Sequence, residues 1–359
     1  MTDSYEPRLI GVIEGCTNPE SAELLPDGET FVFGNCRLMV GIPSFRAGAG
    51  LVYLKGEAFI SRARISPNGE VSLEERALIT GLTGTLGCDV VRNDGGPYPK
   101  GTVFMVEGGD PVTADGGQTF RTDWESRVLI FDPYRGEILG DIPCGEGSAI
   151  AKVFNPVSQA NGCALDSAGN LYFTDIPNAN PDPDPAAAPP VPPAVYRVPV
   201  EAIPGLVARE ADAARAVQRV EMPGYVNGAT VSPLDDTCWA VSCSMVDPAN
   251  GGIYHLPPSA FATGVQPPPT HRDLGILDGV GVTRRGTVLA SNPLTGDLFA
   301  FTADGRELVF QAGPVAMPAD FNVAYPTALG GEPAILAPHI SVGLEPGSGI
   351  VAVLAIEGL

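Results

Sequence analysis

Residues 161–175, NGCALDSAGNLYFTD, indicate the fold of this chain. The stretch begins with Asn-Gly and contains two runs of apolar, aromatic and β-branched residues, CAL and LYFTD, separated by the turn DSAGN. Two such runs joined by a short turn that contains glycine predict a β-hairpin. An isolated hairpin buries too little apolar surface to be stable, so this one is expected to belong to a larger sheet.

Similar hairpins recur along the chain, and they can be aligned on a lead residue that stands about eight positions before the turn residue. The lead residues of the six copies are Glu20, Leu86, Asn161, Asn227, Asp278 and Asn322. A third apolar strand is expected after each copy, at residues 51–55, 127–133, 194–200, 252–258, 297–305 and 350–356. Units of several strands that repeat about every 40 to 50 residues are typical of a β-propeller.

We therefore predict an all-β chain that forms one domain over residues 1–359, a six-bladed β-propeller with four-stranded antiparallel blades. The blades are expected to start near residues 20, 86, 161, 227, 278 and 322. The last copy shows only three strands, so the apolar run RLIGVI at 8–13 is expected to supply its fourth strand and remove a sheet edge. One helix is expected within 206–217, which is rich in good helix formers.

Composition excludes several classes of partner. Lys and Arg number 21 against 42 Asp and Glu, and the resulting net charge of −21 argues against nucleic acid and anionic membranes. The N-terminus lacks the pattern of a signal peptide, and no apolar run is long enough to span a membrane. Seven cysteines without metal-binding spacing indicate buried thiols in a reducing cytoplasm. A cytoplasmic protein with a small-molecule substrate is expected; its oligomeric state stays open.

The lead residues suggest a metal site. The first strand of every propeller blade faces the central channel, so Glu20, Asn161, Asn227 and Asp278 are expected around one point, with Asn322 nearby. Two carboxylates and two amide carbonyls are hard oxygen donors, which suit one Ca²⁺ ion better than zinc. The alternative is that these polar residues only satisfy backbone groups at the strand starts.

The hairpin sequences NGCALDSAGNLYFTD, NGATVSPLDD and DGVGVTRRGTVLAS resemble the repeats of the regucalcin/gluconolactonase and diisopropyl fluorophosphatase superfamily. The resemblance covers about residues 15–356 and implies a six-bladed propeller with one Ca²⁺ in its central channel. It also implies a ligand set of one Glu from the first blade, one Asn from each of the third and fourth, and one Asp from the fifth. The four lead residues Glu20, Asn161, Asn227 and Asp278 match this set in type and order.

Two further stretches, LGCDVV and FNVAYPTALGGEPAILAPHIS, resemble the fluorophosphatase branch of that superfamily. This resemblance implies roles near the mouth of the site for Asn322 and His339. The same branch has a second, structural calcium that uses an Asp and a His where this chain has Gly281 and Ala324. No such second calcium is therefore expected here.

The resemblance implies a calcium-dependent hydrolase acting on a small lactone or ester, with a phosphotriester as a further substrate class. Asp278 would be both a metal ligand and the base or nucleophile, and His339 could move a proton. The candidate substrate contacts are Asn322 and the loop residues Arg37, Met39, Phe45, Arg121 and Trp124. Two alternatives stay open: a metal-assisted, non-hydrolytic cyclase, isomerase or lyase, and a propeller that only binds calcium or a ligand.

Overall fold

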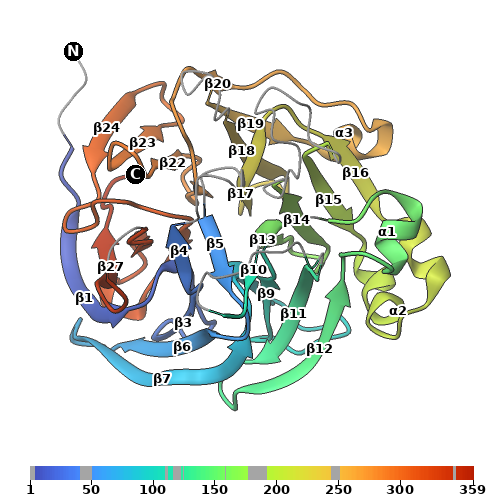
Figure 1. Ribbon diagram of the computed structural model, residues 1–359. Helices are drawn as coiled ribbons and strands as arrows, with labels where there is room; N and C mark the ends of the chain where they lie inside the picture. Colours follow the sequence, from blue (N-terminus) through green and yellow to red (C-terminus); the bar gives the residue numbers. More distant parts are fainter. Residues whose placement is uncertain are drawn as a thin grey trace.

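The computed structural model describes residues 5–40, 51–109, 112–115, 123, 125–157, 159–176, 192–243, 251–342 and 345–359. Their strands form six four-stranded antiparallel sheets and one three-stranded sheet. The four-stranded sheets are arranged around a common centre, and successive sheets follow one another around it (Figure 1). We number these sheets 1 to 6 from the N-terminus and give their strands from the centre outward.

The first three sheets have the following strands. Sheet 1 contains β2 (Pro19–Leu24), β3 (Thr30–Asn35), β6 (Ala58–Ile65) and β7 (Val71–Leu82). Sheet 2 contains β8 (Thr85–Val90), β9 (Val103–Glu107), β11 (Arg127–Asp132) and β12 (Glu137–Pro143). Sheet 3 contains β13 (Ala160–Leu165), β14 (Leu171–Asp175), β15 (Ala194–Val198) and β16 (Gln218–Glu221).

The other three sheets complete the ring. Sheet 4 contains β17 (Tyr225–Val231), β18 (Cys238–Cys243), β19 (Gly252–Leu256) and β20 (His271–Arg272). Sheet 5 contains β21 (Val280–Val282), β22 (Val288–Asn292), β23 (Asp297–Phe301) and β24 (Glu307–Gln311). Sheet 6 contains β25 (Asn322–Ala324), β26 (Ala334–His339), β27 (Gly349–Ala355) and β1 (Arg8–Cys16).

The innermost strands contact one another in a closed cycle. β2 lies against β8, β8 against β13, β13 against β17, β17 against β21, β21 against β25, and β25 against β2. Because each sheet packs between two others, its inner strands are buried on both faces; every residue of β13 and β14 is buried. This double burial explains why the inner strands read as continuous apolar runs.

The hairpin at 161–175 forms as its sequence predicts. Leu165 pairs with Leu171 across the turn, and the Asp166 carboxylate accepts hydrogen bonds from the backbone N–H of Ala168 (3.1 Å) and Asn170 (2.8 Å). Gly169 adopts a φ of +86°, which only glycine tolerates easily. Asp and Gly therefore fix this turn for distinct physical reasons.

The N-terminal run closes the last sheet, as predicted. β1 pairs antiparallel with β27, from Arg8 opposite Ala355 to Cys16 opposite Gly349. This pairing joins the two ends of the chain in one sheet. The seven cysteines are buried and free, which also agrees with the prediction.

The third strand predicted for the first copy is wrong. Residues 51–54 form β5 (Leu51–Leu54), which belongs to the three-stranded sheet with β4 (Leu38–Val40) and β10 (Val112–Thr113). The third strand is β6 instead, because residues 59–64 of this eight-residue strand pair along the whole of β3. The short apolar run of β5 resembled an inner strand only in composition.

Helices are short and lie between the strands. The α-helices are α1 (Ala149–Val153), α2 (Ile203–Val207) and α3 (Pro258–Thr263), and the 3₁₀ helices are η1 (Val200–Ala202), η2 (Ala211–Ala216) and η4 (Thr327–Leu329). The single helix predicted within 206–217 is therefore wrong. Arg209 has a φ of +64°, which breaks the segment between α2 and η2.

A search of the described residues for a helix long and apolar enough to cross a membrane finds none.

Candidate functional site

Four polar lead residues stand at the same end of four first strands. Glu20 lies in β2, Asn161 in β13 and Asn227 in β17, and Asp278 precedes β21. Each has a buried side-chain oxygen without a hydrogen-bond partner: Glu20 Oε2, Asn161 Oδ1, Asn227 Oδ1 and Asp278 Oδ1. Leaving a buried polar atom unpaired costs about 1–3 kcal/mol, so four together indicate a missing ligand. We call these four residues the upper level.

The strands bend at this level. In sheets 1 to 4 the pairing between the first and second strands shifts register at the lead residue and the residue after it. Such β-bulges redirect side chains and are common beside functional sites. The bulge therefore helps to turn the lead residues out of the sheet.

Glycines after the lead residues let neighbouring first strands approach closely. A Cβ on Gly162 would lie 2.5 Å from the backbone nitrogen of Ala229, and one on Gly228 would lie 2.6 Å from the backbone carbonyl oxygen of Asp278. The Gly228 N–H also donates a 2.7 Å hydrogen bond to this carbonyl oxygen. A larger residue at either position would push the strands apart, so these glycines bring the lead residues together.

The two carboxylates of the upper level, Glu20 and Asp278, are buried without a basic partner among the described residues. Burial, together with the carboxylates of Asp320 and Asp278, raises the pKa of Glu20 well above its usual value. Burial raises the pKa of Asp278 to about 7. Among the described residues no Lys, Arg or His forms a salt bridge with Glu20 or Asp278. A bound cation would reverse both shifts, because an opposite charge favours the ionised form.

The donor set fits a hard cation. Among the described residues no group of three or more His, Cys, Asp and Glu side chains is arranged to hold a metal ion. The upper level has only two such side chains and completes its donors with two amide oxygens. Calcium accepts this mixture and fills its remaining positions with water or substrate.

The sixth lead position differs from the predicted one. The Ser291 hydroxyl donates to the Ala319 carbonyl (2.9 Å), as the Thr174 hydroxyl donates to the Asn227 carbonyl (2.6 Å). Ala319 is therefore the counterpart of Asn227, and Asn322 lies three residues further along the chain. Counting eight residues back from the turn gave Asn322 instead, because the turn of sheet 6 is longer and contains η4.

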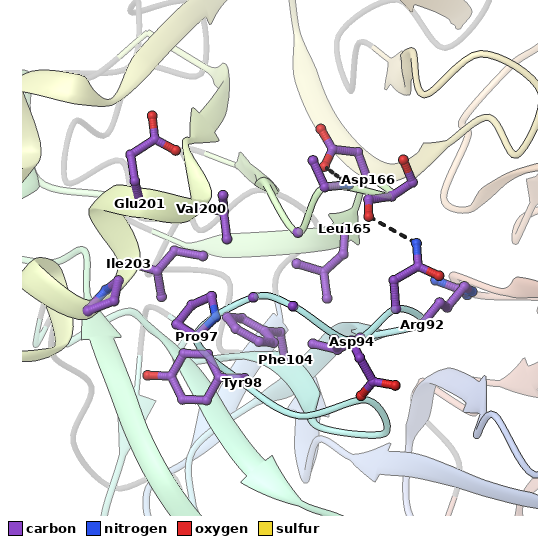
Figure 2. A pocket seen from close by; sticks show the side chains of 18 residues that line it. Arg92, Asp94, Pro97, Tyr98, Phe104, Leu165, Asp166, Val200, Glu201 and Ile203 are labelled. Carbon is purple, nitrogen blue, oxygen red and sulfur yellow. Dashed lines mark hydrogen bonds between the residues drawn. The ribbon is translucent and has the colours of Figure 1, made fainter.

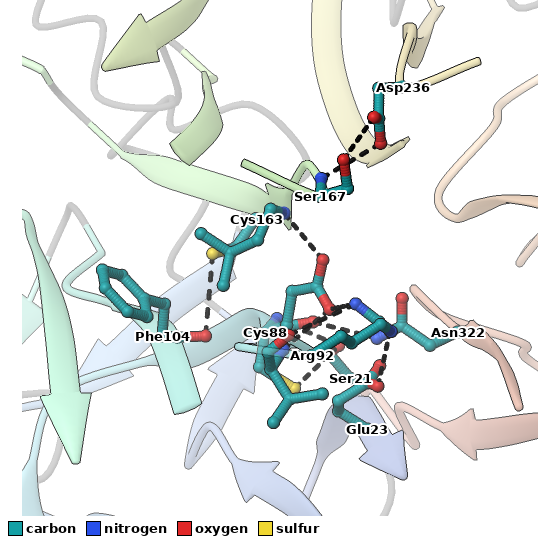
Figure 3. A network of polar contacts seen from close by, with 12 residues as sticks. Ser21, Glu23, Cys88, Arg92, Phe104, Cys163, Ser167, Asp236 and Asn322 are labelled. Carbon is teal, nitrogen blue, oxygen red and sulfur yellow. Dashed lines mark hydrogen bonds and ion pairs between the residues drawn. The ribbon is translucent and has the colours of Figure 1, made fainter. Parts of the chain in front are cut away.

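A second group of polar side chains includes residues that follow the lead positions by three along the first strands (Figure 3). Arg92 pairs with Glu23 (2.8 Å) and with Asp89 (2.5 Å), and both carboxylates are almost fully buried. Asp89 also accepts the backbone N–H of Leu165 (2.7 Å). We call Glu23, Asp89 and Arg92, with Asn322, the lower level.

Asn322 joins the lower level through backbone contacts. Its amide nitrogen donates to the carbonyls of Ala22 (3.2 Å) and Cys88 (2.9 Å), which belong to β2 and β8. The side chain therefore spans two neighbouring first strands. Sequence reasoning missed the charged members of this level, although Glu23 and Asp89 each follow a first-strand lead position by three residues in an apolar run.

His339 lies at the upper end of sheet 6. It ends β26 and bridges to Pro318, just as Asn35 and Asp175 end the second strands of sheets 1 and 3 opposite the strand starts. Its Nε2 atom is buried and has no hydrogen-bond partner. Burial lowers the pKa of its imidazole, so the ring is neutral near pH 7.

The predicted loop residues are placed only in part. Arg37 pairs with Glu57 (2.6 Å), and Met39 lies in β4 and is partly exposed. Phe45, Arg121 and Trp124 lie outside the described residues. The Gln159 side chain, just before β13, donates to the Tyr53 hydroxyl of β5 (2.6 Å), so the three-stranded sheet lies at the upper end.

Two cavities lie at opposite ends of sheet 2. One of about 750 Å³ is at the upper end and is lined by polar residues that include Lys55, Glu107 and Arg127. The other, of about 380 Å³, lies beyond the lower ends of β8 and β13, with Tyr98 and Phe104 on its apolar side (Figure 2). The upper cavity lies at the same end of the sheets as the lead residues, although none of the four lines it.

Comparison with solved structures places the fold among known enzymes and binding proteins. A gluconolactonase from Xanthomonas campestris is 14% identical, with a TM-score of 0.52 over 98% of this chain and 96% of that one. A luciferin-regenerating enzyme is 12% identical, with a TM-score of 0.56 over 98% and 96%. The calcium-binding protein regucalcin from Agrobacterium tumefaciens is 12% identical, with a TM-score of 0.51 over 99% and 96%.

These likenesses show a shared fold and agree with the resemblance found in the sequence. No family model matches this sequence, and no curated protein matches it. At identities this low a common fold does not transfer an activity, so function has to be argued from the site.

Proposed function

We propose that the chain is a single six-bladed β-propeller and a calcium-dependent hydrolase of a small lactone or ester. The observation that carries the proposal is the upper level, where four buried oxygens from four different sheets lack hydrogen-bond partners. The gluconolactonase among the structures with this fold supports a lactone as the first substrate to test. A phosphotriester is a second substrate class with the same need for an activated oxygen.

Glu20, Asn161, Asn227 and Asp278 would hold the Ca²⁺ ion. When bound, the ion would polarise a carbonyl or phosphoryl oxygen of the substrate. The two amides add donors without adding charge, and the glycines behind them fix the spacing of the strands that carry them. The protein thus supplies a rigid set of oxygens built on strands rather than on loops.

Asp278 would act as the nucleophile or base, and His339 would transfer a proton. Close to a cation, the Asp278 carboxylate stays ionised, which favours its use as a nucleophile over its use as a base. The neutral His339 ring, with its free Nε2, can accept a proton from water or donate one to the leaving group once protonated. Both residues stand at the upper end of the sheets.

The loops at the upper end would select the substrate. Arg37 and Met39 would contact the substrate from the side of the three-stranded sheet, and Phe45, Arg121 and Trp124 are proposed as further contacts from the predicted loops. Apolar and aromatic side chains favour a hydrophobic lactone or ester over a bare sugar lactone. Asn322, one level deeper, is proposed to orient polar groups of the site.

The test measures metal content and hydrolysis together. We expect the purified protein to contain about one Ca²⁺ per chain and to hydrolyse a lactone or an aryl ester. Treatment with EGTA should abolish the hydrolysis, and added Ca²⁺ should restore it. Asp278→Asn, which keeps the shape of the side chain, should lower kcat by about 1,000-fold or more, as expected for a nucleophile or base.

The outcomes separate the competing functions. Bound Ca²⁺ with chelator-sensitive stability, but no turnover of any lactone, ester or phosphotriester, would identify a binding protein instead. Isomerisation or ring closure without water uptake would identify a non-hydrolytic enzyme. A protein that binds no metal and ignores EGTA would contradict the proposal.

A further inference from the structure

A third buried carboxylate lies directly below the upper level. Asp320 follows Ala319, which is the counterpart of the lead residues in sheet 6. Asp320 is only 3% exposed. The equivalent position after the lead residue is small in every other sheet: Ser21, Gly87, Gly162, Gly228 and Gly279. Sheet 6 is therefore the one that places a charged side chain in this layer.

The surrounding glycines make room for this carboxylate. Asp320 Oδ1 lies only 2.9 Å from the place that a Cβ on Gly228 would occupy, so the side chain extends from sheet 6 toward sheet 4. The same oxygen accepts the backbone N–H of Phe321 (3.0 Å), which fixes its direction. The carboxylate thus lies inside the ring of first strands.

Asp320 has no counter-charge of its own. Arg92, the cation of the lower level, already pairs with Glu23 and Asp89. Among the described residues, no salt bridge reaches Asp320. Among the carboxylates it raises the pKa of Glu20 most, so the two groups interact. Burial first, and then the carboxylate of Asp278, raise the pKa of Asp320 itself, and a cation bound at the upper level would favour the ionised form of Asp320.

We propose that Asp320 is a positioning residue that strengthens cation binding at the upper level through its charge, without being a ligand. This inference rests on the proposed calcium site. The three carboxylates are not arranged as joint ligands, so the effect is electrostatic and acts over a longer distance. The site is thereby tuned toward cations of higher charge.

The electrostatic role makes a quantitative demand. Coulomb energy is proportional to the charge of the cation. Removing one negative charge must therefore cost a trivalent ion about 1.5 times as much binding free energy as a divalent ion. If Asp320→Asn weakens Ca²⁺ binding about tenfold, it should weaken Tb³⁺ binding about thirtyfold. A purely structural change would affect the two ions alike.

The experiment compares Ca²⁺ affinity by calorimetry with Tb³⁺ affinity by luminescence in the full chain. The variants are Asp320→Asn and Asp320→Ser, the second of which copies the residue of sheet 1. Glu137→Gln is the control, because it removes one exposed carboxylate far from the site and should change neither affinity more than about twofold. The number of water molecules on Tb³⁺, from lifetimes in H₂O and D₂O, should stay unchanged.

Each result has a defined meaning. Weaker Tb³⁺ binding by the larger factor, with an unchanged water number, supports the proposal in either variant. Unchanged affinities, or equal factors for the two ions, would overturn it while leaving the calcium site in place. One more bound water in Asp320→Asn would show a direct ligand and overturn it too. A wild-type protein that binds neither ion would overturn both this proposal and the proposed function.

Discussion

The upper and lower levels of the ring have similar side chains but differ in counter-charge. The lower level buries two carboxylates, Glu23 and Asp89, and pairs both with Arg92, although Glu23 Oε2 has no hydrogen-bond partner. The upper level buries Glu20 and Asp278 and leaves an oxygen of each without a partner. Glu23 and Asp89 each follow the lead position of their own sheet by three residues, so the two levels lie close together along the first strands.

This difference separates structure from function. Buried polar groups are normally hydrogen-bonded, and a charge is rarely buried unless it is paired. At the lower level each carboxylate has Arg92 as its counter-charge, and these ion pairs join two neighbouring sheets. The upper level departs from that rule at four residues at once, which makes it the place where a ligand is expected.

After Asp278→Asn, the largest effect is expected at His339, a base without a hydrogen-bond partner at the upper end. We expect His339→Gln to lower kcat by about 100-fold, because general acid–base catalysis contributes about that much. Burial lowers the pKa of His339, so the ring stays neutral at pH 6.5. The wild-type kcat should therefore start to fall only when the pH is lowered further and the ring becomes protonated. That acidic limb should be absent from the variant.

His255 provides the matched control for this prediction. Its Nε2 atom is also buried without a partner, but it lies on β19, a third strand, where it stacks on Trp239. His255→Gln should therefore leave kcat within about twofold, because a group outside the site makes no contact with the substrate. Equal losses in both variants would mean that His339 acts only through stability.

A smaller effect, on stability, is expected at the lower level. Arg92→Met keeps the aliphatic stem but leaves Glu23 and Asp89 buried and unpaired. We expect the free energy of unfolding to fall by about 2 kcal/mol, less than for a fully buried pair because half of the Arg92 side chain is exposed. Denaturant titration measures it, and adding Glu23→Gln should recover part of the loss.

The control for Arg92 is an arginine at the surface. Arg64 pairs with Glu29 and Glu74 in exposed positions, so Arg64→Met should cost less than about 1 kcal/mol. If the two variants lose the same stability, the lower level is no more structural than an ordinary surface pair, and the contrast between the levels fails.

Much of the fold follows from short-range signals in the sequence. The hairpin at 161–175 is fixed by turn residues whose conformational preferences are local, and its repetition predicts the succession of sheets. The pairing of β1 with β27 was also predicted, because a missing strand and a spare apolar run stand at opposite ends of the chain. Alternation and turn chemistry are enough for such inferences.

The errors arise where spacing or long-range contacts decide. The run at 51–54 has the composition of an inner strand, but pairing with β3 favours the longer β6. The longer turn of sheet 6 shifted the lead position from Asn322 to Ala319. Arg92 reaches Glu23 of another sheet, a contact that no local pattern encodes.

The smallest effect concerns pH and tests the upper level in the absence of metal. Burial raises the pKa of Asp278 to about 7, so the folded chain holds that proton more tightly than the unfolded chain does. The stability gained is present below the unfolded pKa near 4 and is lost as the pH rises through about 7. In EGTA, the free energy of unfolding should therefore fall by about 1 kcal/mol between pH 6.5 and 8, and Tm by about 1 °C. Excess Ca²⁺ should remove this fall, since it stabilises the ionised carboxylate, and Asp278→Asn should lack it in either buffer. A Tm that stays constant over the same range in EGTA would show that the upper carboxylates are ionised in the folded chain without a metal, and the two levels would then not differ.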